Sequence, residues 1–118
     1  NVGVAPLSKM FDLDYMPLLG SDNVMLNSPN MFREMEFTLK LMSVYYKRYI
    51  NPKELVKMAT TNVCGFKIND VVQKSVILED NFAEFIVFKS FSKNPYLNIC
   101  NRVETKNILY TINKKVNV

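Results

Sequence analysis

The residue in this chain best placed to do chemistry is Asp22, in the stretch Leu19-Gly20-Ser21-Asp22-Asn23. A short apolar run ends at the glycine, a polar loop follows, and a long apolar segment begins near Pro29. Barrels and doubly wound sheets present catalytic acids in this way, at the C-terminal end of a strand and before the next helix. Gly-Ser-Asp-Asn is also ordinary turn chemistry, in which Asp22 would bond its own backbone. Spacing alone leaves both interpretations open.

Two other residue types limit the chemistry further. The chain has no histidine, which excludes the usual zinc clusters, the Ser-His and Cys-His nucleophile pairs and histidine acid-base catalysis within it. The two cysteines, Cys64 and Cys100, lack metal-type spacing. We expect two buried reduced thiols, with a disulfide between them as the alternative.

Composition narrows the class of protein. With 118 residues, 48% of them hydrophobic, one small core is expected. The apolar runs are too short for a membrane span and no secretory signal is present, so we expect a cytoplasmic protein without a membrane partner. The net charge of +4 is scattered along the chain, so no nucleic-acid partner is expected. A β domain that binds RNA or DNA is a third interpretation, resting on the basic balance and the aromatic residues.

Several elements are expected to position the loop that carries Asp22. Ser8 would cap a short helix over residues 9–13, and residues 15–19 suit a buried strand. Ser28 and Pro29 then start a helix over residues 29–46, whose apolar positions recur every three or four residues. Its apolar face is expected to include these residues: Phe32, Met35, Phe37, Leu39, Leu41, Met42, Val44, Tyr45 or Tyr46, and Tyr49. Core packing explains this face more simply than a ligand pocket.

The next segment repeats the start signal of a helix. Asn51 is the expected cap, Pro52 the first helical residue, and Glu54 completes a capping box, with the helix ending around residues 62–65. From Phe66 the pattern changes to short β-rich runs, at residues 71–72, 76–78, 85–88, 97–99, 108–112 and 116. Asn113-Lys114 is predicted to form a hairpin turn, and residues 103–106 a helical turn or a loop.

These elements predict an α+β fold of an unusual kind. A single buried strand between helices is not a sheet, since a parallel strand needs neighbours on both sides. The chain also begins at Asn1 rather than Met, with apolar Val2 and Val4 following at once. We therefore expect a fragment of a longer protein.

Five short motifs follow one another along the chain: Gly3-Val4-Ala5-Pro6-Leu7, Leu19-Gly20-Ser21-Asp22-Asn23, Phe32-Arg33-Glu34-Met35, Met58-Ala59-Thr60-Thr61-Asn62 and Ala83-Glu84-Phe85-Ile86-Val87-Phe88. Their order resembles the C-terminal third of the metal-dependent amidohydrolase superfamily, in particular its cytosine deaminase, chlorohydrolase and imidazolonepropionase-related branch. The resemblance implies that residues 1–65 are the C-terminal end of an (α/β)8 TIM barrel, with strand 8 and the closing helices. Residues 66–118 would then be part of a small composite β-sandwich domain.

The resemblance also implies roles for particular residues. Asp22 would be a metal ligand and the catalytic acid that takes a proton from metal-bound water and passes it to the leaving nitrogen. Asn23 and Asn27 would contact substrate, although loop hydrogen bonding explains them equally well. The parent enzyme would use a divalent metal, zinc or iron, to hydrolyse a C–N bond of a small cyclic amide, amidine or aminated heterocycle.

This sequence departs from the family pattern in two ways. Ser21 stands where threonine is usual, Glu84 replaces an aspartate, and several turn glycines of the small domain are absent. More importantly, the family's histidine ligands would all lie upstream of Asn1, so the fragment alone is expected to be inactive.

The partners of the fragment would be the upstream part of its own chain, the parent's small-molecule substrate and a second copy in a homo-oligomer. The alternative is a non-catalytic interaction or assembly module related to amidohydrolases, with the apolar helix as its interface.

Overall fold

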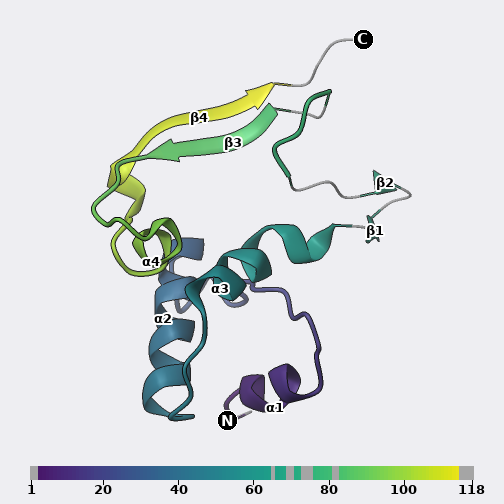
Figure 1. Cartoon of the computed structure of the whole chain (residues 1–118), viewed down its shortest axis with the longest axis vertical. Coiled ribbons are helices and arrows are strands. Elements are labelled where there is room, and N and C mark those ends of the chain that lie inside the picture. The colour runs from purple at the N-terminus through teal and green to yellow at the C-terminus, as the bar shows by residue number, and fades with distance from the viewer. Residues whose placement is uncertain (1–2, 65, 69–70, 73–75, 81–82, 115–118) are drawn as a thin grey trace.

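A computed structural model describes residues 3–64, 66–68, 71–72, 76–80 and 83–114. Its elements, in chain order, are α1 (Leu7–Asp12), α2 (Met31–Val44), α3 (Pro52–Ala59), the 3-10 helix η1 (Thr61–Val63), β1 (Lys67–Ile68), β2 (Val71–Val72), β3 (Ala83–Phe88), α4 (Pro95–Asn101), the 3-10 helix η2 (Thr105–Asn107) and β4 (Ile108–Lys114). The helices gather at one end of the molecule and the β3–β4 ribbon lies at the other (Figure 1). Both element types are present, as the α+β prediction requires, while the origin in a barrel and a sandwich stays a prediction.

Helix α2 begins two residues later than the sequence predicts. Its N-cap is Asn30, whose Oδ1 accepts hydrogen bonds from the backbone N–H of Phe32 at 3.0 Å and of Arg33 at 3.4 Å. The prediction that Ser28 caps the helix and Pro29 opens it is therefore wrong. The Asn30 side chain satisfies the first unpaired N–H groups of the helix, and this fixes where the helix starts.

The buried face of α2 is narrower than predicted. Met35 and Met42 are buried as expected, whereas Phe37 and Val44 are 63% and 76% exposed. Tyr49, beyond the end of the helix, is also exposed. The spacing of apolar residues predicts the wider face, but Phe37, Val44 and Tyr49 are not covered by the described part of the chain.

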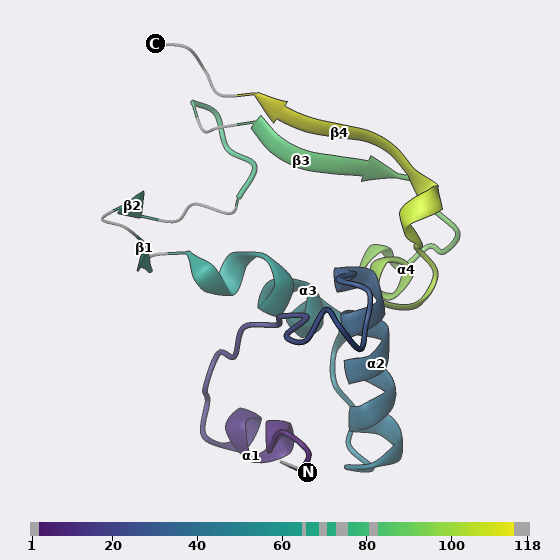
Figure 2. The same cartoon turned by 180° about the vertical axis from the view of Figure 1, so that it is seen from behind.

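The core lies between α2, α3 and α4, which contact one another and stand close together in Figures 1 and 2. Its buried apolar side chains are Met35, Met42, Ile50, Leu55, Met58 and Cys100. Helix α3 starts at the predicted residues: Asn51 Oδ1 accepts from the N–H of Lys53 at 3.0 Å, and Pro52 is at the first turn. The predicted capping box is wrong, because the Glu54 carboxylate accepts from Lys57 Nζ at 2.8 Å instead. The core joins residues on both sides of the predicted domain boundary at residue 65, and that boundary stays a prediction.

Helix α4 replaces a strand that the sequence predicts over residues 97–99. That prediction is wrong because Asn94 caps a helix here, its Oδ1 accepting from the N–H of Leu97 at 3.0 Å, with Pro95 in the first turn. Inside the helix, buried Asn98 accepts a hydrogen bond from the N–H of Phe91 at 2.8 Å. The polar side chain thus fastens the loop before α4 onto the helix itself.

Replacing Asn94 with Ala is expected to lower the free energy of unfolding by about 1 kcal/mol, because the N–H of Leu97 loses its acceptor. Urea unfolding followed by circular dichroism measures the change. Asn94→Ser keeps a capping oxygen, so its free energy of unfolding should fall by only about a few tenths of a kcal/mol. Equal losses in the two variants would show that the cap does not determine this helix.

The strands form two separate antiparallel pairs. β1 and β2 pair over two residues each, and β3 pairs with β4 in a register that places Phe85 opposite Ile112 and Val87 opposite Tyr110. The predicted turn at Asn113-Lys114 is wrong, because Asn113 lies in β4 opposite Glu84. The run predicted at residues 76–78 forms no strand, and Val116 lies outside the described residues.

The N-terminal segment is held by the connection between α2 and α3. Arg48 Nη1 donates to the carbonyl and the Oγ of Ser8 at 2.8 and 3.0 Å and to Asp12 Oδ1 at 2.6 Å. Ser8 therefore lies inside α1 as an acceptor for Arg48, and the prediction that it caps the helix is wrong.

Residues 15–19 form no strand, so that prediction is also wrong. Tyr15, Met16 and Leu18 are each more than half exposed, and the Leu19 N–H donates to the Met58 carbonyl at 3.0 Å. No described strand lies beside this segment to complete a ladder.

Among the described helices, none has the length and apolar character needed to cross a bilayer.

Candidate functional site

Asp22 lies in the loop between residues 15–19 and α2. Its φ of 46° is in the left-handed region, which Asp and Asn tolerate better than most residues. The side chain is exposed and has no hydrogen bond or ion pair with any described residue. Its carboxylate is therefore accessible from solvent and is not used to hold the loop.

Asn23 holds the loop instead. Its side-chain Oδ1 accepts from the N–H of Met25 at 2.9 Å, and its carbonyl accepts from the N–H groups of Leu26 and Asn27, both at 3.2 Å. This is the local turn bonding that the sequence also allows for Asp22. The structure gives that role to the neighbouring asparagine.

The three predicted site residues thus lie together in one exposed loop. Asp22, Asn23 and Asn27 are all exposed, and the Asn23 carbonyl directly bonds the Asn27 N–H. Over the part of the chain that the structure describes, no group of three or more His, Cys, Asp or Glu side chains could hold a metal ion. These residues therefore do not fit a metal centre by themselves, and their substrate and metal roles stay predictions.

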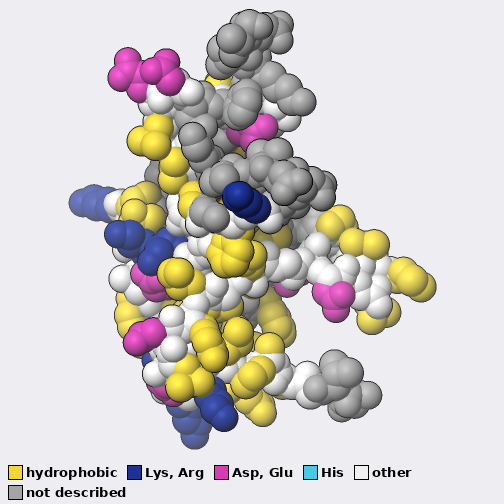
Figure 3. All heavy atoms as spheres, turned by 90° about the vertical axis from the view of Figure 1, so that its right-hand side faces the viewer, with side chains coloured by type: hydrophobic (Ala, Val, Ile, Leu, Met, Phe, Trp, Pro, Cys, Tyr) yellow, Lys and Arg dark blue, Asp and Glu magenta, His cyan; other side chains and the backbone are white. Residues whose placement is uncertain are grey.

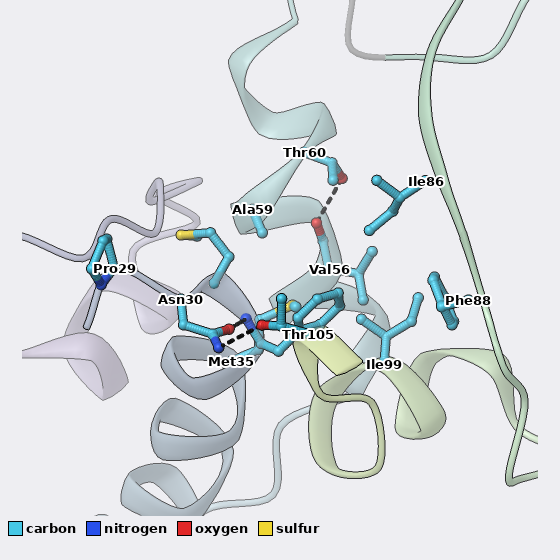
Figure 4. Close-up of a pocket in the computed structure, with 12 residues that line it drawn as sticks. Pro29, Asn30, Met35, Val56, Ala59, Thr60, Ile86, Phe88, Ile99 and Thr105 are labelled. Carbon is cyan, nitrogen blue, oxygen red and sulfur yellow. Dashed lines mark hydrogen bonds between the residues drawn. The ribbon is translucent and has the colours of Figure 1, made fainter. Parts of the chain in front are cut away.

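A hollow lies between α2, α3 and β3, where the sequence favoured core packing over a ligand pocket on the apolar face of α2. Its volume is about 420 Å³, and Figure 4 shows its walls. The lining residues are Pro29, Asn30, Met31, Phe32, Met35, Val56, Ala59, Thr60, Ile86, Phe88, Ile99 and Thr105. Its walls come from segments far apart in the chain, so no local motif could reveal it. The predicted site residues do not line it, although Pro29 and Asn30 connect the two regions.

The polar side chains that line this hollow make hydrogen bonds within the chain. Asn30 Nδ2 donates to Thr105 Oγ1 at 3.1 Å, and Thr60 Oγ1 donates to the Val56 carbonyl at 2.6 Å (Figure 4). Phe32 also meets Phe88 edge-on, with ring centroids 6.4 Å apart. The hollow is therefore suited to apolar groups.

Neither cysteine forms a disulfide, as predicted, but the prediction that both are buried holds for Cys100 only, because Cys64 is half-buried. Cys100 is fully buried in the helical core, and its Sγ lies 3.5 Å from the Pro52 carbonyl that accepts from it. Burial raises the pKa of the Cys100 thiol to about 11. A thiol this far from ionisation is a packing residue and a poor nucleophile.

We expect a thiol-alkylating reagent at pH 8 to label half-buried Cys64 before Cys100, whose thiolate fraction is very small in the folded protein. Mass spectrometry of quenched time points measures the order, and Cys64→Ser isolates the slower site. Because the folded pKa lies above the value of 9.0 for an unperturbed thiol, the Cys100 contribution to stability falls as the pH rises from about 9 through 11. Rapid labelling of Cys100 in the folded protein would contradict its burial.

Comparison with known proteins finds relatives of this chain. It is 43% identical over 113 residues to a protein of Methanothermobacter thermautotrophicus named "Putative aminohydrolase". It is 32% identical over 114 residues to an uncharacterized protein of Methanocaldococcus jannaschii. The matches cover 95% and 92% of this chain but 28% of each relative, so the chain spans just over a quarter of their length. No family model and no solved structure matches the chain.

Proposed function

We propose that this chain is the C-terminal part of a metal-dependent amidohydrolase. The observation that carries the proposal is the 43% identity, over nearly the whole chain, to a relative named as an aminohydrolase. The ordered motifs from Gly3 to Phe88 support the more specific assignment to the amidohydrolase superfamily, with residues 1–65 from its barrel and 66–118 from its small β domain. The whole protein would hydrolyse a C–N bond of a small cyclic amide, amidine or aminated heterocycle.

Asp22 is the residue of this chain that we propose takes part in the chemistry. Its carboxylate is exposed and is not used in the loop's own hydrogen bonds, because Asn23 supplies those. A carboxylate in this state can accept a proton from an attacking water and return it to a leaving nitrogen. Asn27, which Asn23 ties to the same loop, would contact the substrate beside Asp22.

The metal of such an enzyme does not fit the described residues alone. Asp22 supplies one carboxylate, the chain has no histidine, and no cluster of ligands stands within the described ranges. Zinc or iron would therefore take its other ligands from chain outside these 118 residues. For the same reason we propose that the 118-residue chain is inactive by itself.

The test is the complete polypeptide that the native gene encodes. We expect its sequence before Asn1 to contain a His-x-His pair, the purified protein to hold a divalent metal, and ammonia or ring-opened product to form from a panel of cyclic amides, amidines and aminated heterocycles. Prolonged chelation should abolish turnover, and the added metal should restore it. A complete upstream sequence without the histidine pair would overturn the enzymatic proposal.

The exposed apolar side chains favour a second candidate, a non-catalytic assembly module. Phe37, Val44 and Tyr45 lie more than 60% exposed along or just after α2, which suits an interface between copies or with another chain. The native mass distinguishes the two candidates. A native polypeptide of only these 118 residues, assembled as a homo-oligomer, would favour the module, whereas a chain several times longer would favour the hydrolase.

A further inference from the structure

We infer that the hollow between α2, α3 and β3 receives an apolar side chain from the remainder of the longer polypeptide, carried on an extended segment that runs beside β3. This inference rests on the proposed function in one respect, namely that the chain is part of a longer protein. It adds a specific docking site, with residues that can be tested.

The walls of the hollow select an apolar occupant. Met35, Val56 and Ile99 line it from three helices, and Ile86 and Phe88 point into it from β3 (Figure 4). The polar side chains at its rim, Asn30, Thr60 and Thr105, are bonded within the chain. Each of these groups already makes a hydrogen bond within the chain and the rest of the lining is apolar, so burial of a polar ligand here would be poorly compensated.

One edge of β3, the strand beside the hollow, has no partner strand among the described residues. Within the described residues β3 pairs only with β4, and its other edge faces the helices in both views of the ribbon (Figures 1 and 2). Two-stranded ribbons are marginal in water, and exposed strand edges are ready templates for another strand. An extended segment on this edge would lie across the mouth of the hollow.

The ribbon has apolar surface to bury on the side away from the hollow too. Phe85, Val87 and Tyr110 are 37%, 40% and 67% exposed, and the register places Val87 opposite Tyr110. Figure 3 shows hydrophobic side chains spread over another face of the molecule as well. Burying this much apolar surface requires more covering chain than one small molecule supplies.

The length of the relatives indicates which chain supplies the cover. The matched region is only 28% of each of them, so most of each polypeptide lies outside the part that corresponds to this chain. A segment of the same polypeptide docks without the translational cost that a separate partner must overcome. For that reason we assign the hollow to the longer polypeptide rather than to a second copy.

Photo-crosslinking in the complete polypeptide tests the assignment. Ile86, which lines the hollow and is 41% exposed, is replaced by p-benzoylphenylalanine and irradiated, and the joined peptides are identified by mass spectrometry. We expect one dominant crosslink to a peptide outside residues 1–118. The same replacement at Val44, which is 76% exposed on α2 and does not line the hollow, should not capture that peptide.

Other crosslinking outcomes would overturn the inference. A crosslink that joins Ile86 only to residues 1–118 of the same molecule would mean that the hollow closes on itself. A crosslink between isotopically distinct copies would identify a dimer contact, and no crosslink would leave the hollow open to solvent or to a small molecule. A metal-bound, active hydrolase with any of these results overturns this inference alone, whereas the expected crosslink in a protein without metal or activity overturns the proposed function alone.

A second measurement uses the sign of a stability change. Ala59→Phe places a ring in the hollow, and in the complete polypeptide it should displace the docked side chain and lower Tm by about 2–8 °C. Ser43→Phe, on an exposed position of α2, gives the effect of an added ring elsewhere. If the hollow is empty, filling it should instead leave Tm unchanged or raise it, and that result would contradict the docking.

Discussion

Replacing Asp22 with Asn is expected to lower kcat of the complete hydrolase by about 10²–10⁴-fold, the usual contribution of a positioned acid-base group. Asparagine keeps the size of the side chain and tolerates the φ of 46°, so the loop should keep its shape. The turn bonds come from Asn23 and are untouched by the change. The amide simply cannot take up a proton. Ammonia release under saturating substrate, with Tm as a folding control, measures the effect.

Asp14 offers a matched control for this variant. It is also an exposed aspartate with a positive φ, 55°, but it lies at the end of α1 rather than in the loop before α2. Asp14→Asn should therefore leave kcat within a factor of about two while making the same change of charge. Equal losses at the two positions would point to general charge effects. Full activity in Asp22→Asn would remove this residue from the chemistry.

The start of a helix could be predicted from a capping asparagine followed by proline, provided that the residues after it did not favour a strand. Asn51-Pro52 was correctly predicted to open α3, and Asn94-Pro95 carries the same signal for α4. The second was missed because the apolar run at residues 97–99 favours a strand by composition. A side chain that caps the first turn, together with a proline in it, outweighs the weak strand propensity of three residues.

The segment at residues 15–19 shows a different limit. Its apolar residues suit a buried strand by composition, but Tyr15, Met16 and Leu18 are exposed, and no strand lies beside the segment to bond with it among the described residues. A local sequence carries no information about where such a partner is. The prediction of a barrel strand here depends on chain beyond this structure.

The loop with the candidate site could be proposed from the sequence, but the hollow could not, because a local sequence does not show which distant segments pack together. Asp22, Asn23 and Asn27 were proposed because they lie in one loop beside a motif that resembles the amidohydrolase pattern, and their roles stay predictions. The hollow was not proposed, because Met35, Val56 and Ile86 are brought together only by packing between helices and a strand. Sequence reasoning finds sites built from one loop more readily than sites built from several elements.

Truncating Leu55 to Ala is expected to cost about 2–5 kcal/mol of unfolding free energy. Leu55 has no exposed surface and belongs to the core cluster where α2, α3 and α4 meet. Removing its branched end leaves a cavity between helices that are pinned at other points, such as the bond between Cys100 Sγ and the Pro52 carbonyl. The walls can therefore collapse only in part, and the cavity adds to the lost hydrophobic transfer energy.

Leu109→Ala is the matched control for this truncation, because it removes the same atoms from a side chain that is 57% exposed on β4. It should cost well under half as much as Leu55→Ala, since most of its surface already contacts water. Urea midpoints at constant m-value compare the two variants of the complete protein. Equal losses would mean that the three helices do not form the main core, and that the ribbon carries as much of the stability as they do.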